Sequence, residues 1–310
     1  MKVIFLGTPE FAVKTLEAIS NSKHQIVGVI CQVDKPSGRG NKMLAPPVKQ
    51  KAQELGFNVY QFNKIRVEGI QTLKNLNADI MVTAAYGQIL SQEIIDICPK
   101  GIINVHGSLL PKYRGASPIQ TAIINGETET GITIMKTDAG IDTGDMIISK
   151  KCKIELNDTY GTLSEKLANI GAELCVTALD LIEDQREVYT PQIENMATHT
   201  KMFKKEDTQI NFNNNANQIV NFVRGLNPNP IAFFTLGGLP YKVFESKEVA
   251  YTGLEKNGTI LSASSKAGLV IKCEGGAVEI IEITAPNSKK MLAKSYLNGK
   301  TLPVGEVVNG

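Results

Sequence analysis

The stretch at residues 3–30 reads VIFLGTPEFAVKTLEAISNSKHQIVGVI and decides the fold. Residues 3–6 form a short, continuous apolar run, which is typical of a strand buried on both faces of a sheet. Residues 10–19 carry apolar side chains at nearly helical spacing, and residues 25–30 form a second apolar run. A strand, a helix and a second strand in this order predict a βαβ unit with parallel strands.

The alternation of strands and helices continues through the first half of the chain. Further apolar runs predict strands, and amphipathic stretches between them predict helices. The expected strands cover residues 58–60, 78–85, 101–105, 131–135 and 145–148, and the expected helices cover residues 47–55, 70–76 and 159–182. Because strands joined through helices run parallel in one sheet, we predict an α/β fold of the Rossmann-like kind with a mostly parallel sheet.

The pattern of apolar and polar residues changes after about residue 185. A polar stretch containing Pro191 is typical of a linker, and short β-prone runs separated by turn residues follow it. Several short strands at this spacing favour a small barrel. We therefore predict a catalytic domain over residues 1–188, a linker over residues 189–206, and a smaller C-terminal β-barrel domain of the OB-like kind over residues 207–310.

Composition and charge exclude few partners. The chain has 310 residues and a formal net charge of +2, so any case for RNA binding must rest on local clusters of charge. Its five cysteines form no CxxC pair, which argues against a zinc site or a disulfide framework. The apolar N-terminal run is too short for a signal peptide or a membrane span. We expect a cytoplasmic protein that binds no metal and enters no membrane.

The most polar stretch of the α/β half is NVHGSLLP at residues 104–111, at the end of an expected strand. Ligands in open α/β sheets bind beyond the carboxyl ends of the strands. Strand alternation places Asn104 and His106 on the same face. An amide and an imidazole aimed at one point could bind a carbonyl oxygen and move a proton. The alternative is a histidine that is simply hydrogen-bonded at the end of a strand.

A second polar segment, DAGIDTGD at residues 138–145, lies between two expected strands. Its two glycines and three acids predict a tight loop that presents carboxylates. A plain turn would explain the segment about as well. A calcium loop of the EF-hand kind would need a glutamate at its twelfth position and flanking helices, which are missing.

Together these residues resemble the folate-dependent formyltransferase family. The resemblance rests on Asn104-x-His106, on SLLP at residues 108–111, and on Asp142 within IDTG at residues 141–144. That family uses an asparagine, a histidine and an aspartate as its catalytic trio, which implies that Asn104, His106 and Asp142 are catalytic here. The resemblance also implies that a formyl group passes from 10-formyltetrahydrofolate, a reduced folate, to an amine without help from a metal.

The resemblance assigns a role to each member of the trio. Asn104 would donate a hydrogen bond to the formyl oxygen, on which charge develops during attack. His106 would stabilise the same charge and protonate the leaving folate nitrogen. Asp142 would assist His106 and help to move the proton of the amine.

The resemblance also implies a folate pocket beside the trio. The segment YGQIL at residues 86–90 is similar to a folate-pocket segment of the family, and residues 108–111 would shape the same pocket. The residues implied to bind folate are Tyr86, Gln88, Ile89, Leu90, Ser108, Leu109, Leu110 and Pro111. We expect a cis bond between Leu110 and Pro111, since that isomer is accessible mainly before proline.

The acceptor is implied by the loop DKPSGRGNKMLAPPVK at residues 34–49. Taken alone, a basic loop is more often a solvated surface than a phosphate-binding one. This loop, however, resembles the one with which methionyl-tRNA formyltransferases enter the acceptor stem. The resemblance implies methionyl-initiator tRNA as the acceptor, with contacts from Lys35, Arg39 and Lys42. It also implies a tRNA-binding barrel, no obligate protein partner, and a bacterial cytoplasm, where translation starts with formylmethionine.

Other functions stay open at this point. An amino-sugar nucleotide N-formyltransferase uses the same trio, and some such enzymes carry a small C-terminal barrel. A nicotinamide dehydrogenase needs a G-x-G-x-x-G turn after the first strand, which GTPEF at residues 7–11 lacks. The chain also departs from the family, because Asn229 stands where tryptophan is common and Ile210-Asn211 replaces a usual aspartate-tryptophan pair.

Overall fold

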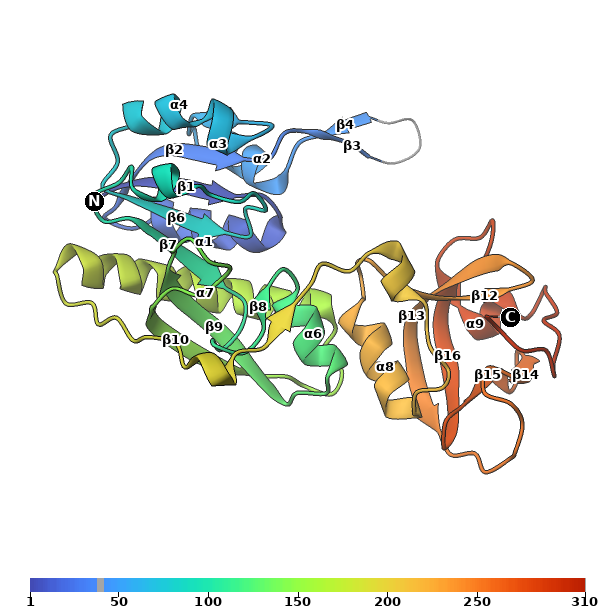
Figure 1. Cartoon of the computed structure of the whole chain (residues 1–310). Helices are drawn as coiled ribbons and strands as arrows, with labels where there is room; N and C mark the ends of the chain where they lie inside the picture. The colour runs from blue at the N-terminus through green and yellow to red at the C-terminus, as the bar shows by residue number, and fades with distance from the viewer. Residues whose placement is uncertain (38–41, 310) are drawn as a thin grey trace. The chain divides into compact units, whose positions relative to one another are not determined.

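The computed structural model describes residues 1–37 and 42–309, which form two compact units (Figure 1). Unit 1 comprises residues 1–118, 129–153 and 164–200, and unit 2 comprises residues 119–128, 154–163 and 201–310. Each unit has its own sheet and its own hydrophobic core.

The central sheet of unit 1 confirms the predicted, mostly parallel arrangement. Its strand order is β10-β9-β7-β6-β1-β2-β5. The strands are β1 (Lys2–Gly7), β2 (Gln25–Cys31), β5 (Val59–Gln61), β6 (Ile80–Ala84), β7 (Ile102–His106), β9 (Glu129–Lys136) and β10 (Met146–Lys153). Strands β7, β6, β1, β2 and β5 run parallel to one another. Strand β9 is antiparallel to β7, and β10 is antiparallel to β9. The strand order reverses between β1 and β6, and open α/β sheets bind their ligands at such a point.

The first βαβ unit supplies part of the core of unit 1. Residues 3–6 of β1 have no exposed surface, as expected for a strand covered on both faces. Helix α1 (Glu10–Ser20) follows, and its Leu16 and Ile19 are fully buried. Burying an aliphatic or aromatic side chain of this size stabilises the fold by roughly 1.5–3 kcal/mol. This packing fixes the sheet on which the site is built.

Only some of the remaining helices of the α/β half could be predicted from the sequence. They are α2 (Pro47–Glu54), α3 (Ile65–Glu68), α4 (Ile70–Asn75), α5 (Gln92–Ile95), α6 (Pro118–Ile124) and α7 (Tyr160–Glu183). Helices α2, α4 and α7 confirm the predicted helices. Helices α3 and α5 have four residues each, which is too short to leave a periodic apolar pattern.

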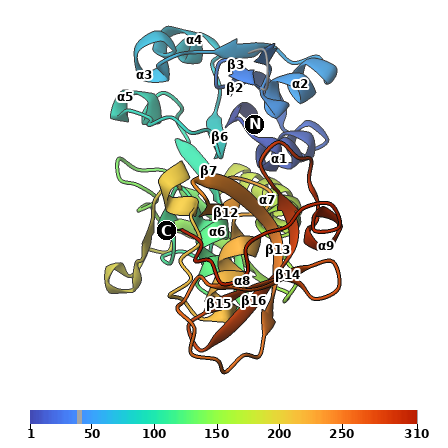
Figure 2. The same cartoon turned by 90° about the vertical axis from the view of Figure 1, so that its right-hand side faces the viewer.

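Unit 2 is built on an antiparallel, barrel-like sheet with the order β12-β13-β16-β15-β14, and β17 pairs with β16 (Figure 2). Its elements are α8 (Ala216–Gly225), β12 (Ala232–Leu236), β13 (Leu239–Val249), β14 (Ile260–Ser264), β15 (Gly268–Cys273), β16 (Gly276–Thr284), β17 (Met291–Leu292) and α9 (Ala293–Tyr296). Helix α8 packs against β13 and β16. A capping box between Asn215 and Gln218 sets the start of this helix.

Aromatic and aliphatic residues fill the core of unit 2 without any tryptophan. Phe234 stacks on Tyr241 with 5.2 Å between the ring centroids, and Phe212 meets Phe234 edge-on. Ile210, which replaces a polar residue of the family pattern, is 1% exposed and belongs to the same core. Of the departures noted in the sequence, Ile210 is therefore accommodated by apolar packing, whereas Asn211 and Asn229 are exposed.

The stretch expected to be a linker, residues 189–206, is tied to unit 1 over its first half. Thr190 forms a β-bridge with Met146, and β11 (His199–Thr200) pairs in parallel with β8 (Arg114–Gly115). Such short pieces leave no periodic signal in a sequence. Residues 189–200 therefore belong to the structure of unit 1, and residues 201–206 belong to unit 2.

Among the residues that the structure describes, no helix has both the length and the apolar character needed to cross a bilayer. The five cysteines are free thiols. Burial raises the pKa of the Cys31 thiol to about 11 and that of the Cys175 thiol to about 12. These two thiols are therefore protonated and unreactive near neutral pH.

Candidate active site

The structure brings Asn104, His106 and Asp142 together at the end of β7. Asn104 and His106 are two residues apart on this strand, so their side chains share a face. Nδ2 of Asn104 lies 3.4 Å from Oδ1 of Asp142, and Nδ1 of His106 lies 3.5 Å from Oδ2. An amide, an imidazole and a carboxylate thus form one contact network.

Thr83 on the neighbouring strand orients the Asn104 amide. The two residues are register partners on β6 and β7, and Oγ1 of Thr83 lies 2.8 Å from Oδ1 of Asn104. Because the Asp142 carboxylate can only accept hydrogen bonds, Nδ2 must be the amide atom that faces it. Thr83 is buried, and it lay within a predicted strand without being recognised as part of the site. Only the pairing of the two strands reveals its role.

One main-chain carbonyl and one side-chain carboxylate define how the His106 ring is held. Nε2 lies 3.0 Å from the carbonyl oxygen of Tyr113, and a carbonyl oxygen only accepts, so Nε2 carries a hydrogen. Nδ1 faces Asp142, and the side chain is 5% exposed. When the ring is protonated, each of its N–H groups therefore has an oxygen acceptor.

Asp142 lies in a tight loop that only some residue types can form. Its φ angle of 53° is in the left-handed region, which aspartate tolerates better than most residues. Its Oδ2 accepts a hydrogen bond of 2.8 Å from the backbone N–H of Gly115. A side chain at Gly144 would collide with the carbonyl oxygen of Lys136, so glycine is required there. Asp138 accepts hydrogen bonds from Gly140 and Thr143 and shapes the same loop.

The first segment implied to bind folate, residues 86–90, follows β6. The Tyr86 ring is buried in the core, and burial raises the pKa of its hydroxyl. Gln88 is fixed at both ends, because Oε1 accepts from the Ile65 N–H and Nε2 donates to the Phe62 carbonyl, each at 2.9 Å. Ile89 is 76% exposed, and Leu90 packs against the core. The side chains of this segment therefore hold the loop, and Ile89 is the one left projecting.

The second segment implied to bind folate, residues 108–111, follows β7. Ser108 is fully buried, and its hydroxyl donates to the Lys112 carbonyl at 2.6 Å. Thr133 on β9 holds the segment, because its hydroxyl donates to the Ser108 carbonyl and accepts from the Leu110 N–H. Leu110 is buried, Leu109 and Pro111 are half-buried, and the Leu110–Pro111 bond is cis, as expected.

The basic loop forms a hairpin of β3 (Lys35–Ser37) and β4 (Lys42–Leu44) that projects from the body of unit 1 (Figure 1). Lys35 is exposed and donates to Oε1 of Gln32. The backbone of Lys42 pairs in β4, and Arg39 lies outside the described residues. Met43 and Leu44 are each 57% exposed.

The base of this hairpin is anchored by polar side chains. Lys49 donates to both carboxylate oxygens of Asp34 and to Oε1 of Gln61, at 2.8–2.9 Å. Hydrogen bonds from Lys49 and Gln61 lower the pKa of the Asp34 carboxyl. Lys49 therefore supports the hairpin and is not one of its free charges.

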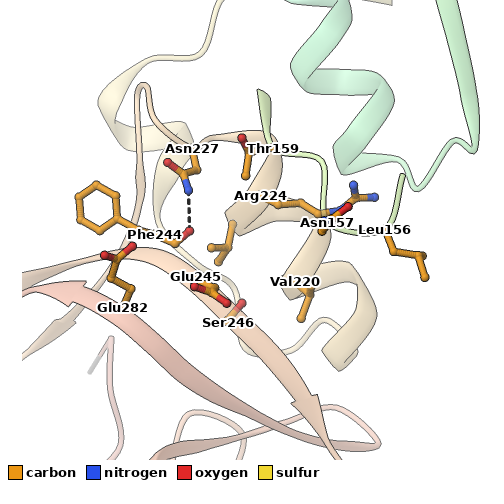
Figure 3. Close-up of a pocket in the computed structure, with 11 residues that line it drawn as sticks. Leu156, Asn157, Thr159, Val220, Arg224, Asn227, Phe244, Glu245, Ser246 and Glu282 are labelled. Carbon is orange, nitrogen blue, oxygen red and sulfur yellow. Dashed lines mark hydrogen bonds between the residues drawn. The ribbon is translucent and has the colours of Figure 1, made fainter. Parts of the chain in front are cut away.

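Unit 2 contains a cavity of about 420 Å³ that none of the predicted site residues line (Figure 3). Nδ2 of Asn227 donates to the Phe244 carbonyl at 2.8 Å on one side of it. On the other side, Nη1 of Arg224 donates to the carbonyl oxygens of Glu155 and Asp158, at 3.2 and 3.0 Å. Burial lowers the pKa of the Arg224 guanidinium. Arg224 thus ties α8 to residues 155–158 within unit 2.

Replacing Arg224 with methionine should destabilise unit 2 by about 1–3 kcal/mol, because two main-chain carbonyls lose a charged donor while the aliphatic packing is kept. Urea unfolding of the full chain measures the change. The control is Arg186→Met, whose guanidinium is exposed and pairs with Asp184; it should change stability by less than about 0.5 kcal/mol. Equal unfolding midpoints for the two variants would contradict the anchoring role.

Comparison with known families matches both halves of the chain. A family model described as formyl transferase matches residues 1–179, and one described as formyl transferase, C-terminal domain, matches residues 202–301. An N-formyltransferase from Helicobacter canadensis, solved with folinic acid and dTDP-3-aminofucose, shares the fold with a TM-score of 0.66 and 21% identity. That match covers 90% of this chain and 98% of the other. The fold and the family match define the protein as a formyltransferase.

Sequence relatives narrow the class. The methionyl-tRNA formyltransferase of Acetivibrio thermocellus is 44% identical over 99% of each chain. That of Clostridioides difficile is 42% identical over 99% of this chain and 100% of its own length. The chain belongs to the methionyl-tRNA formyltransferase family.

Proposed function

We propose that the enzyme transfers the formyl group of 10-formyltetrahydrofolate to the free amino group of methionyl-initiator tRNA. The product would be the N-formylmethionyl-tRNA that starts translation in a bacterial cytoplasm. The observation that carries the proposal is the contact network of Asn104, His106 and Asp142 at the end of β7. Similarity to methionyl-tRNA formyltransferases over nearly the whole chain supports this acceptor.

Asn104 is the proposed donor to the formyl oxygen. As the amine nitrogen bonds to the formyl carbon, negative charge collects on that oxygen. The hydrogen bond between Thr83 and Oδ1 keeps Nδ2 as the atom available for donation. One such donor typically lowers the barrier by about 2.7–4 kcal/mol.

His106 and Asp142 are the proposed proton carriers. The attacking amine must lose a proton, which Asp142 accepts directly or through a water molecule. The folate nitrogen must gain a proton from His106 as its bond to the formyl carbon breaks. The contact between Nδ1 and Asp142 lets the proton return to His106 afterwards. General acid–base catalysis of this kind typically contributes about 10²–10⁴-fold to the rate.

Folate is proposed to bind along residues 86–90 and 108–111. Gln88 and Thr133 support this proposal, because they hold the two segments through main-chain hydrogen bonds. Rigid main chain beside a catalytic group favours precise placement of a substrate. The binding residues would be Tyr86, Gln88, Ile89, Leu90, Ser108, Leu109, Leu110 and Pro111.

The tRNA is proposed to contact the hairpin and the C-terminal barrel. Lys35, Arg39 and Lys42 would face phosphates of the acceptor stem, where basic side chains bind by releasing counterions. Residues 1–188 would form the catalytic domain, residues 189–206 the connection, and residues 207–310 the tRNA-binding domain. The anchored base of the hairpin supports this proposal, since a fixed base sets the direction in which the basic residues reach.

Replacing Arg39 with alanine should raise KM for charged tRNA by about 10–100-fold, because a charge-assisted hydrogen bond is worth roughly 1.5–3 kcal/mol. The KM for the folate should stay the same. The matched control is Arg66→Ala, an exposed arginine on α3, which should leave both constants unchanged. Unchanged tRNA kinetics in the Arg39 variant would refute the proposed role of the loop.

A formyl-transfer assay with 10-formyltetrahydrofolate tests the proposed acceptor directly. Methionyl-initiator tRNA and an amino-sugar nucleotide are offered in parallel to the same enzyme. Transfer to the tRNA alone is the expected result. Transfer to the sugar alone would keep the roles of the trio but overturn the acceptor.

A further inference from the structure

Gln192, which lies in the stretch expected to be a linker, is bonded directly to the catalytic loop. Its Nε2 donates to the carbonyl oxygens of Asp142 and Gly144, at 2.9 and 2.8 Å. Its Oε1 accepts from Nε of Arg114 at 3.0 Å. Carbonyl oxygens only accept and a guanidinium only donates, so the orientation of the amide is unambiguous. Both N–H groups and the oxygen of this side chain are therefore in use.

Arg114 holds Gln192 from the opposite side. It is 1% exposed, and its Nη1 forms an ion pair of 2.9 Å with Glu194. A buried arginine of this kind depends on its partners, because an uncompensated buried charge is costly. The ion pair with Glu194 and the hydrogen bond to Gln192 thus connect β8 to residues 190–200.

The segment around β8 touches two members of the catalytic trio. The Tyr113 carbonyl accepts from Nε2 of His106, and the Gly115 N–H donates to Oδ2 of Asp142. Gly115 has a φ angle of 105°, and a side chain there would collide with the Thr200 carbonyl in β11. Strand β8 therefore lies between the catalytic residues and the segment that carries Gln192.

The backbone at Asp142 needs outside support. Its φ angle of 53° is sparsely populated for residues other than glycine, and such conformations persist when the surroundings determine them. Gln192 supplies that support, because it binds the carbonyl of Asp142 itself and that of Gly144, two residues further on. Its side-chain hydrogen bonds go to this loop and to Arg114.

We propose that Gln192 is a positioning residue for catalysis, which keeps the Asp142 carboxylate between Asn104 and His106. The inference rests on the proposed function, in which Asp142 moves a proton. Displacement of a catalytic group by about 1 Å can slow a reaction roughly 10²-fold. Gln192 therefore acts on turnover through Asp142 and leaves substrate binding unchanged.

The test compares Gln192→Met and Gln192→Glu in the full-length enzyme. Methionine keeps the length of the side chain and removes every hydrogen bond. Glutamate keeps an acceptor for Arg114 and removes both donors to the loop, so it isolates the contact with Asp142. We expect kcat to fall by about 10–100-fold in both variants, with KM for folate and for the acceptor within about threefold of wild type. The surface variant Gln71→Met should match wild type.

A second measurement separates positioning from general stability. In an Asp142→Asn background, followed by single-turnover assays with excess enzyme, adding Gln192→Met should slow transfer less than threefold, because residues that act as a unit are not additive. If Gln192→Met slows transfer in that background by the same factor, about 10–100-fold, as in the otherwise wild-type enzyme, the inference is overturned. A kcat within twofold of wild type in Gln192→Glu would overturn it as well. If the wild-type enzyme itself formylates neither acceptor, the proposed function fails and the failure does not come from Gln192.

Discussion

The His106→Ala variant is expected to lose about 10²–10⁴-fold in kcat for formyl transfer while it still binds tRNA. The imidazole has two ring nitrogens that can each carry a proton, one facing the Tyr113 carbonyl and the other facing the Asp142 carboxylate. Alanine removes both, so the proton that Asp142 takes from the amine loses the imidazole through which it would reach the folate nitrogen. The Asn104–Asp142 contact does not involve the ring and should persist.

His199→Ala is the matched control for this experiment. His199 is exposed, and it takes part in β11 through its backbone, which the substitution keeps. Its kcat should stay within about twofold of wild type. Thermal unfolding shows whether the His106 variant is folded. Filter binding shows whether it still binds charged tRNA. Near-normal turnover in a folded His106→Ala enzyme would rule out the catalytic role.

The Asn104→Ala variant is expected to lose about 10²–10³-fold in kcat, which is the usual loss when one donor to a developing oxyanion is removed. The interaction forms in the transition state, so kcat and kcat/KM should fall together. Steady-state kinetics with saturating folate measures both constants. A rise in KM at unchanged kcat would mean that Asn104 binds the ground state and does not stabilise the transition state.

Thr83→Val gives a graded comparison with Asn104→Ala, because Thr83 holds the same amide. Valine keeps the branched shape that suits a strand and removes the hydroxyl that fixes the Asn104 amide. We expect a loss of about tenfold or less, since a single neutral hydrogen bond is worth roughly 0.5–1.5 kcal/mol. A larger loss than in Asn104→Ala would contradict the view that Thr83 works through Asn104.

Much of unit 1 could be predicted because its strands have a local signature. Residues 3–6 read as a strand covered on both faces, and the structure buries all of them. The shared face of Asn104 and His106 also follows from strand alternation alone. Their link to Asp142 does not, because 36 residues separate His106 from Asp142 and no local pattern relates them. The family resemblance supplied that expectation.

The hairpin β3–β4 could not be predicted from local sequence patterns. Each of its strands has three residues, too few to display alternation, so the sequence indicated only a polar loop. Lys49 looked like one more charge of that loop, yet it pairs with Asp34 and Gln61. Gln61 belongs to β5, and only the packing of the sheet brings it there.

By itself, the sequence determined the order and kind of the main elements and the residue types at the site, because apolar periodicity and backbone propensity act over a few neighbouring residues. The tertiary structure alone decided which polar groups meet. Thr83 reaches Asn104 through the pairing of two strands, and Gln192 reaches Asp142 from 50 residues away. Hydrogen bonds of this kind depend on how distant segments pack, and that packing leaves no local pattern in the chain.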